Sequence, residues 1–129
     1  TSAYGSCIFY EHGKTGACLI GKDHRHCFHA HLHCIPVKVS MSEEVSSEIE
    51  GHAFDSIKYA YDYARGCERY LYVEDSKIIV YTPSEKLRTQ YLRYKLATSL
   101  GMTERWDWVR LQNWDLIKTT VDKLKTFFV

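Results

Sequence analysis

The chain has 129 residues, of which 45% are hydrophobic and 26% charged, a balance that is typical of a folded globular domain and excludes an intrinsically disordered chain. Its 17 basic and 16 acidic residues leave a formal net charge of +1, which gives no general attraction to nucleic acid or to anionic membranes. The apolar runs are far too short to span a bilayer, and no signal segment opens the sequence. We therefore expect one domain over residues 1–129, in the cytoplasm or the nucleus.

The first third of the chain predicts two paired strands. Residues 7–10 have the β-prone composition of a strand that ends at residues 11–13. The polar, glycine-containing residues 14–25 predict a loop, and residues 28–34 predict the second strand.

The middle of the chain predicts helical structure followed by a hairpin. Ser42 has the character of an N-cap, and apolar residues at helical spacing predict one or two helices from Ser42 to Arg65, ended by Gly66. The β-prone runs 70–73 and 78–81 flank a polar turn and predict a β-hairpin.

Two further helices are predicted towards the C-terminus. The segment 82–85, Thr-Pro-Ser-Glu, has the pattern of a capping box and opens a helix that Gly101 should end. Asn113 can cap a last helix. The apolar stripe of that helix consists of Trp114, Ile117, Val121, Leu124 and Phe128.

Histidines alternate with apolar residues in residues 28–34. On a strand, His29, His31 and His33 share one face, while Phe28, Ala30, Leu32 and Cys34 share the other. We expect helices to pack against the apolar face. Three imidazoles in a row pack poorly and lose hydration unless each finds a partner, so the histidine face indicates chemistry.

Three interpretations of the histidine face remain open. It can ligate a metal, with His24, His26 and Cys27 as further ligands. It can perform covalent catalysis, since a neutral imidazole can attack phosphorus. It can also be a solvated polar face. The five cysteines contain no Cys-x-x-Cys pair, which favours reduced thiols over a disulfide framework or a structural zinc site.

A family resemblance favours the second interpretation. Residues 29–36, His-Ala-His-Leu-His-Cys-Ile-Pro, resemble the signature of the histidine triad family. In one branch of that family, a Phe-x-Glu-His-Gly strand precedes the triad and a Ser-Gln-aromatic-Leu-Arg helix follows it. Residues 9–13 and 88–93 look like these two segments, and Trp106-Asp107-Trp108 also fits that branch.

The resemblance implies an α+β fold, with an antiparallel sheet that carries the triad on one strand. It implies a hydrolase or nucleotidyl transferase in which His31 attacks the α-phosphate of a nucleotide and forms a nucleotidyl-histidine intermediate. His29 and His33 would flank the nucleophile, orienting it, assisting the leaving group and binding phosphate oxygens. The implied substrates are nucleoside phosphoramidates or dinucleoside polyphosphates, with a purine nucleotide favoured and no metal or cofactor required.

The same resemblance assigns roles outside the triad. Gln90 and Thr89 would donate hydrogen bonds to the phosphate, and Arg93 would place a guanidinium against its charge. Glu11 and His12 are candidates for orienting groups close to the triad.

The sequence departs from the family pattern upstream of the triad. In the family, much of the nucleoside pocket precedes the triad, whereas only 28 residues precede His29 here. We therefore expect that the upstream part of the usual domain is absent from this sequence, or that a partner chain supplies it; a homodimer is a further expectation. The alternatives to an enzyme are a non-catalytic nucleotide-binding or interaction module, and a metal site on the histidine face. We expect residues 23–26 to be a solvated turn.

Overall fold

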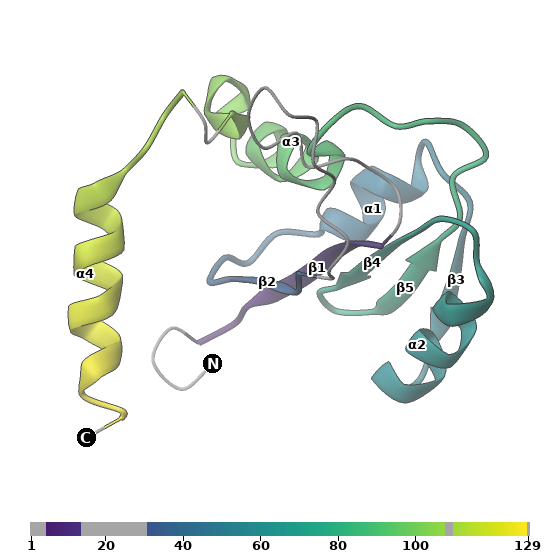
Figure 1. Ribbon diagram of the computed structural model, residues 1–129, viewed down its shortest axis with the longest axis horizontal. Coiled ribbons are helices and arrows are strands. Elements are labelled where there is room, and N and C mark those ends of the chain that lie inside the picture. Colours follow the sequence, from purple (N-terminus) through teal and green to yellow (C-terminus); the bar gives the residue numbers. More distant parts are fainter. Residues whose placement is uncertain (1–4, 14–30, 108–109, 129) are drawn as a thin grey trace, which may run out of the picture.

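The computed structural model describes residues 5–13, 31–107 and 110–128. These residues form a five-stranded antiparallel sheet in the order β2-β1-β4-β5-β3, together with four α-helices and one 3-10 turn (Figure 1). The strands are β1 (Ile8–Gly13), β2 (His33–Ile35), β3 (Gly51–Phe54), β4 (Tyr70–Glu74) and β5 (Ile78–Tyr81). The helices are α1 (Met41–Ser46), α2 (Ile57–Gly66), α3 (Tyr91–Ser99) and α4 (Trp114–Lys125), with the 3-10 turn at Thr103–Trp106. The expected α+β class is confirmed.

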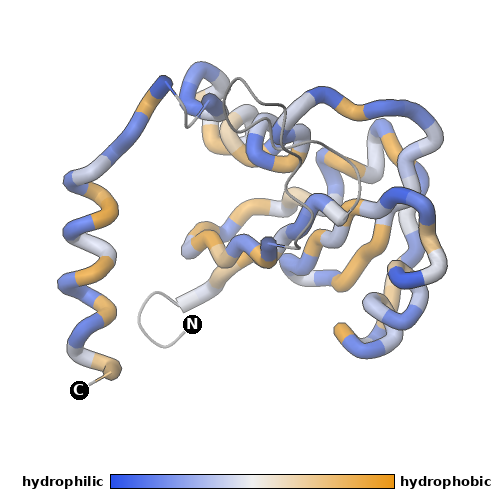
Figure 2. Tube along the Cα trace, viewed as in Figure 1, coloured by the Kyte–Doolittle hydropathy of each residue, from blue (hydrophilic) through white to orange (hydrophobic). Residues whose placement is uncertain are grey.

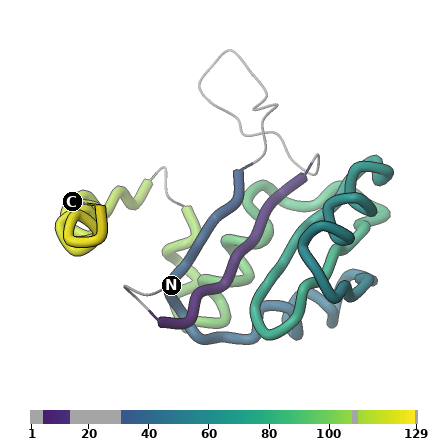
Figure 3. The backbone as a smooth tube through the Cα atoms, turned by 90° about the horizontal axis from the view of Figure 1, so that it is seen from below, coloured from purple at the N-terminus to yellow at the C-terminus, as the bar shows by residue number. Residues whose placement is uncertain are grey.

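The larger core lies between one face of the sheet and helices α1 and α3 (Figures 1 and 3). Tyr10 of β1 and Leu71 of β4 contribute from the sheet, while Val45 of α1 and Leu92 of α3 contribute from the helices. These side chains are at most 2% exposed, so they account for much of the apolar burial that stabilises the domain.

A smaller core lies on the opposite face of the sheet, against α2. Ala60 and Ala64 are one helical turn apart and let α2 approach the rings of Tyr70 and Tyr72 closely. Helix α2 begins after Ser56, whose hydroxyl accepts the Tyr59 N–H, and it ends at Gly66, as expected.

The turn of the β4–β5 hairpin caps helix α1. The Asp75 carboxylate accepts hydrogen bonds from the backbone N–H of Ser42 at 2.8 Å and from the Ser42 hydroxyl at 3.0 Å. The hairpin itself was expected and is confirmed. The prediction that Ser42 is the N-cap is wrong, because α1 begins at Met41 and Ser42 lies in its first turn. The N–H of Ser42 has no partner within the helix, and the carboxylate of Asp75 accepts it.

Strand β3 was not predicted. One or two helices were expected between Ser42 and Arg65, and the structure has two, α1 and α2. Strand β3 lies between them in the chain and pairs with β5 at the edge of the sheet opposite β2. Its sequence, Gly-His-Ala-Phe, lacks the alternation that identifies a strand. The edge of β5 requires a partner for its N–H and C=O groups, and this tertiary requirement determines the structure of the segment.

The predicted start of the next helix is also wrong. Residues 82–90 are not helical, and α3 begins only at Tyr91. Gln90 has a left-handed backbone conformation with φ 56°, which ends any helical run before it. Gly101 ends α3 as expected, with φ 67°.

The expectation that helices cover the apolar face of the histidine strand is not met at Leu32 and Cys34, and Phe28 and Ala30 of that face lie outside the described residues. Strand β2 holds only His33–Ile35, at the edge of the sheet, and His33 pairs with Tyr10 of the larger core. Leu32 is 47% exposed and Cys34 is exposed. Because the β1–β2 register places His33 and Tyr10 together, the histidine faces the side that α1 and α3 cover.

Helix α4 stands apart from the rest of the fold (Figures 1 and 3). Asn113 occupies its N-cap position, as predicted, but the Asn113 side chain makes no capping hydrogen bond. None of its described side chains is buried, and hydrophobic and hydrophilic residues alternate along it (Figure 2). In the described part of the chain, no helix combines the length and the apolar character needed to cross a membrane.

The two leucines Leu92 and Leu116 provide a matched test of this packing. Leu92 is fully buried under the sheet, and Leu116 is 61% exposed on α4. We expect Leu92→Ala to lower the free energy of unfolding by about 2–5 kcal/mol, since it removes buried methyl groups and leaves a cavity. Leu116→Ala should change it by no more than about 0.5 kcal/mol. Urea denaturation of both variants measures the difference, and equal effects would contradict the burial described here.

Candidate functional site

The described histidines of the triad lie at the edge of the sheet, where β2 meets β1. The ring of His33 stacks on the ring of Tyr10, with 4.7 Å between centroids and 19° between planes. His31 precedes β2 and lies with its ring centroid 6.4 Å from that of His33. His29 lies outside the described residues. The two imidazoles are exposed, so a ligand can reach both.

Tyr10 determines how His33 lies. Only 2% of Tyr10 is exposed, and burial raises the pKa of its phenol, against a smaller opposite effect of the Arg93 charge. A buried, neutral ring gives the imidazole a flat apolar surface on one side, and this restricts its rotation. This role of Tyr10 was missed, although its alternation with Ile8 in β1 indicates a core-facing side chain.

The electrostatic surroundings favour a neutral His33. Burial lowers the pKa of His33 most, and the neighbouring His31 and Arg93 lower it further, while the Glu11 carboxylate acts in the opposite direction. A neutral imidazole keeps a lone pair on one ring nitrogen, so it can accept a proton or act as a nucleophile.

His12 links β1 to helix α3. Its Nε2 atom accepts the backbone N–H of Leu92 at 3.0 Å, within the first turn of the helix. The accepting nitrogen carries no proton, so the proton of the neutral ring is on Nδ1. Burial, with a smaller contribution from His33, lowers the pKa of His12 from 6.5 to about 4. His12 is therefore a neutral structural acceptor at pH 7.

The start of α3 carries the residues that the resemblance assigns to phosphate binding. Gln90 is the N-cap and is half-buried, and Thr89 before it is exposed. Arg93 lies one residue after Leu92, and its charge acts on both His33 and Tyr10. The structure thus brings a guanidinium to the histidine edge of the sheet.

Arg88 holds the segment that leads into α3. Its guanidinium carbon lies 3.7 Å from the ring centroid of Tyr94 and 4.6 Å from that of Trp106. A cation between two aromatic faces is attracted by both rings, so the contact holds Arg88, which precedes α3, against Tyr94 of the helix. The contact of Arg88 with Tyr94 and Trp106 could not be predicted from the sequence. The only sequence indication is that Arg88 and Trp106 both belong to segments that resemble the histidine triad family.

Glu11 points to the opposite face from the histidines. It is 2% exposed, and it accepts hydrogen bonds from the hydroxyls of Tyr61, at 2.7 Å, and Tyr70. The Tyr70 ring lies across Gly13, where any Cβ atom would collide with it. Glu11 therefore contacts tyrosines and no imidazole in this network, and it influences the histidine face only through its charge.

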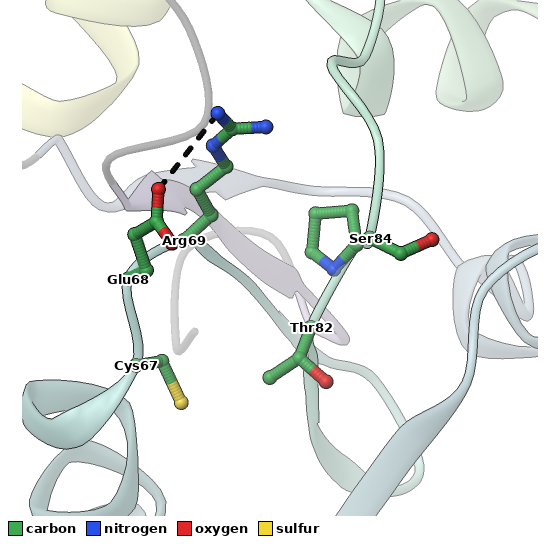
Figure 4. A pocket seen from close by; sticks show the side chains of 6 residues that line it. Cys67, Glu68, Arg69, Thr82 and Ser84 are labelled. Carbon is green, nitrogen blue, oxygen red and sulfur yellow. Dashed lines mark ion pairs between the residues drawn. The ribbon is translucent and has the colours of Figure 1, made fainter.

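Two cavities lie outside the cluster of imidazoles. A groove of about 550 Å³ runs between Arg93 of α3 and the helix α4. A second cavity of about 370 Å³ lies where Arg69 precedes β4 and Thr82 follows β5, beside the Glu68–Arg69 ion pair at 3.9 Å (Figure 4). Neither of these two cavities is lined by His31 or His33.

The metal interpretation gains no described site. Across the three described stretches of the chain, no three His, Cys, Asp or Glu side chains gather in a group that could hold a metal ion. The further candidate ligands His24, His26 and Cys27 lie outside these stretches. Within the described residues, no disulfide involves Cys7, Cys34 or Cys67.

Comparison with known proteins gives no independent assignment. No protein-family model matches the chain, and no curated protein or solved structure matches it significantly.

The depressed pKa of His12 leads to a prediction about acid stability. Because folding lowers this pKa from 6.5 to about 4, the unfolded chain binds the proton more tightly between these values. His12 should therefore favour the fold fully above pH 6.5 and lose this contribution as the pH falls to about 4. An NMR titration of the His12 ring measures the pKa, and a value near 6.5 would contradict the geometry. His12→Gln, whose amide can still accept the Leu92 N–H, should flatten the pH dependence of unfolding in this window.

Proposed function

We propose that this chain is a nucleotide hydrolase or nucleotidyl transferase of the histidine triad type, with His31 as the nucleophile. The observation that carries the proposal is the group formed by His31, the stacked His33 and the positive charge of Arg93 at one sheet edge. A nucleophile, a proton-transferring imidazole and a cation are the groups that displacement at a nucleotide phosphate requires.

In the proposed reaction, a ring nitrogen of His31 attacks the α-phosphorus of a phosphoramidate or a dinucleoside polyphosphate. The bond from phosphorus to the leaving group breaks as the N–P bond forms. A flanking imidazole, His29 or His33 in its protonated form, gives the leaving group the proton that it needs and is left neutral. Water or phosphate then attacks the nucleotidyl-histidine, any proton that the attacking group loses passes to this neutral imidazole, the N–P bond breaks, and His31 is regenerated.

The residues at the start of α3 would stabilise the charge on the phosphate. The Arg93 guanidinium offers charge-assisted hydrogen bonds, and Gln90 and Thr89 offer an amide and a hydroxyl. Arg88, held between Tyr94 and Trp106, positions these two residues. His12 would position the start of α3 through its hydrogen bond to Leu92. Glu11 would influence His33 through its charge alone.

The exposure of His31 and His33 also favours a second candidate, a non-catalytic nucleotide-binding module. An open edge gives a phosphate access but gives a nucleoside little surface to bind. A partner chain or a further segment could supply that surface. Adenosine monophosphate that binds tightly, with no turnover of any phosphoramidate or dinucleoside polyphosphate, would favour this candidate.

Substitution of His31 tests the covalent mechanism. We expect His31→Ala to abolish hydrolysis of adenosine phosphoramidate and to abolish the nucleotidyl adduct seen by intact-mass spectrometry after a brief reaction. The matched control is His52→Ala, since His52 is exposed on β3 at the other edge of the sheet, against Tyr63. The control should retain both turnover and adduct. Full turnover by a folded His31→Ala protein would refute the proposal.

Substitution of Arg93 tests the role of its charge. Arg93→Gln should lower kcat/KM by about 10- to 100-fold, because it removes a charge-assisted contact with the phosphate. It should also raise the pKa of His33, which Arg93 now lowers, and so move the limb of the pH–rate profile that reports His33 to higher pH. Arg65→Gln, on the exposed side of α2, serves as the control and should change neither quantity. A lower rate with neither limb of the profile moved would contradict the influence of Arg93 on His33.

A further inference from the structure

The groove between α3 and α4 combines an apolar wall with a cation. Its volume of about 550 Å³ falls within the range of sites for small organic ligands, roughly 300–1,000 Å³. Five large apolar side chains line it, of which Trp114 is the largest. The polar part of the lining consists of Arg93, Gln112, Asn113 and Thr120. A mostly apolar wall with a few polar groups is the usual composition of a small-molecule site.

Arg93 connects this groove to the histidine edge of the sheet. The residue is half-buried, and none of the ion pairs among the described residues includes its guanidinium. The same charge lowers the pKa of His33. A half-buried cation with no described carboxylate partner favours an anionic ligand, and this one borders both the imidazoles and the groove.

Trp114 gives the groove a flat aromatic surface. The residue is 61% exposed at the start of α4. An exposed indole is a platform on which a nucleobase stacks, whatever the base. Gln112 and Asn113 come directly before it, and the Asn113 side chain makes no capping hydrogen bond to the helix. An amide carries both donors and an acceptor, so it can pair with the polar edge of a base.

The distance along a nucleotide decides which base reaches the groove. Under the proposed function, the α-phosphate lies between His31 and Arg93, and Arg93 also lines the groove. Only a ribose separates the α-phosphate from the base of the same nucleotide. The second base of a dinucleoside polyphosphate is several phosphates further away. The base attached to the reacting phosphate is therefore the part of the substrate that fits here.

We propose that the groove between α3 and α4 is the nucleobase site of this chain. The base stacks on the indole of Trp114, the amides of Gln112 and Asn113 bind its edge, and the 5′-phosphate pairs with Arg93. Helix α4 thus provides the nucleoside surface that the open edge of the sheet lacks. The position of the phosphate rests on the proposed function, whereas binding of the base is measurable without turnover.

Binding of adenosine monophosphate and ribose 5-phosphate to the whole chain, measured by isothermal titration calorimetry, tests the site. The two ligands share the sugar phosphate and differ in the base. Adenosine monophosphate should bind about tenfold more tightly, because its base stacks on Trp114. Trp114→Ala should remove this preference by weakening adenosine monophosphate about tenfold and leaving ribose 5-phosphate unchanged.

Phe127→Ala is the matched control. Phe127 is also aromatic and is 54% exposed, but it lies beyond α4 and does not line the groove. The control should keep the preference for adenosine monophosphate. Both variants should fold, since no described side chain of α4 is buried, and circular dichroism with thermal unfolding verifies this.

Arg93→Gln separates the phosphate end of the site from the base end. It should weaken both ligands by the same factor, because both carry the phosphate, and leave the ratio of their affinities unchanged. An Arg93→Gln chain that loses only the preference for adenosine monophosphate would contradict this arrangement.

Three results would overturn the base site. The first is equal binding of the two ligands by the wild-type chain. The second is a preference for adenosine monophosphate that Trp114→Ala retains, as expected if a peptide or a second copy of the chain fills the groove instead. The third is an equal loss of preference in Phe127→Ala.

Turnover distinguishes this failure from failure of the proposed function. Trp114→Ala should raise KM for adenosine phosphoramidate about tenfold and leave kcat nearly unchanged, since the base takes no part in the displacement. Preferential binding of adenosine monophosphate through Trp114 without any turnover would leave the base site standing and refute catalysis. Turnover by a chain that binds both ligands equally would refute the base site alone.

Discussion

The hydrogen bond from the Leu92 N–H to Nε2 of His12 is the interaction on which the candidate site depends. It joins the second position of α3 to β1 and thereby fixes where the helix begins relative to the sheet. Arg93 follows Leu92 directly, so the same bond determines how near the guanidinium lies to His33. A helix start usually leaves its first N–H groups to solvent or to its own cap. Here one of them is used to position a cation.

Strand β1 separates two kinds of electrostatic environment. On one face, Tyr10 contacts the rings of His12 and His33, and the charge of Arg93 acts on His33. On the other face, Glu11 accepts hydrogen bonds from two tyrosines. Because successive residues of a strand point to opposite faces, Glu11 lies on one face of β1 while Tyr10 and His12 lie on the other. The carboxylate of Glu11 and the imidazole of His33 are therefore on opposite sides of the sheet. Their influence on each other is limited to the field through the sheet.

Elements with strong local signals could be predicted from the sequence, and those set by distant partners could not. The β4–β5 hairpin and the end of α3 at Gly101 depend on turn and cap residues that act locally. Helix α4 follows the helical spacing of its apolar residues. Strand β3 depends on the free edge of β5, and the late start of α3 depends on its contact with His12. At the site, alternation predicted that His31 and His33 lie close together, and their ring centroids are 6.4 Å apart, although His31 precedes β2. No local pattern showed that Tyr10 would stack on His33.

The left-handed backbone conformation of Gln90 lowers the stability of the domain, whereas its side-chain amide serves the proposed function. A non-glycine residue with φ 56° is strained by roughly 1 kcal/mol or more, whereas glycine adopts this conformation readily. Glycine at this position would thus make the domain more stable, and it would also remove the amide that the proposed reaction places beside the phosphate. Selection for thermal stability and selection for turnover would therefore favour different residues here. Under the proposed function, position 90 therefore sets thermal stability against turnover.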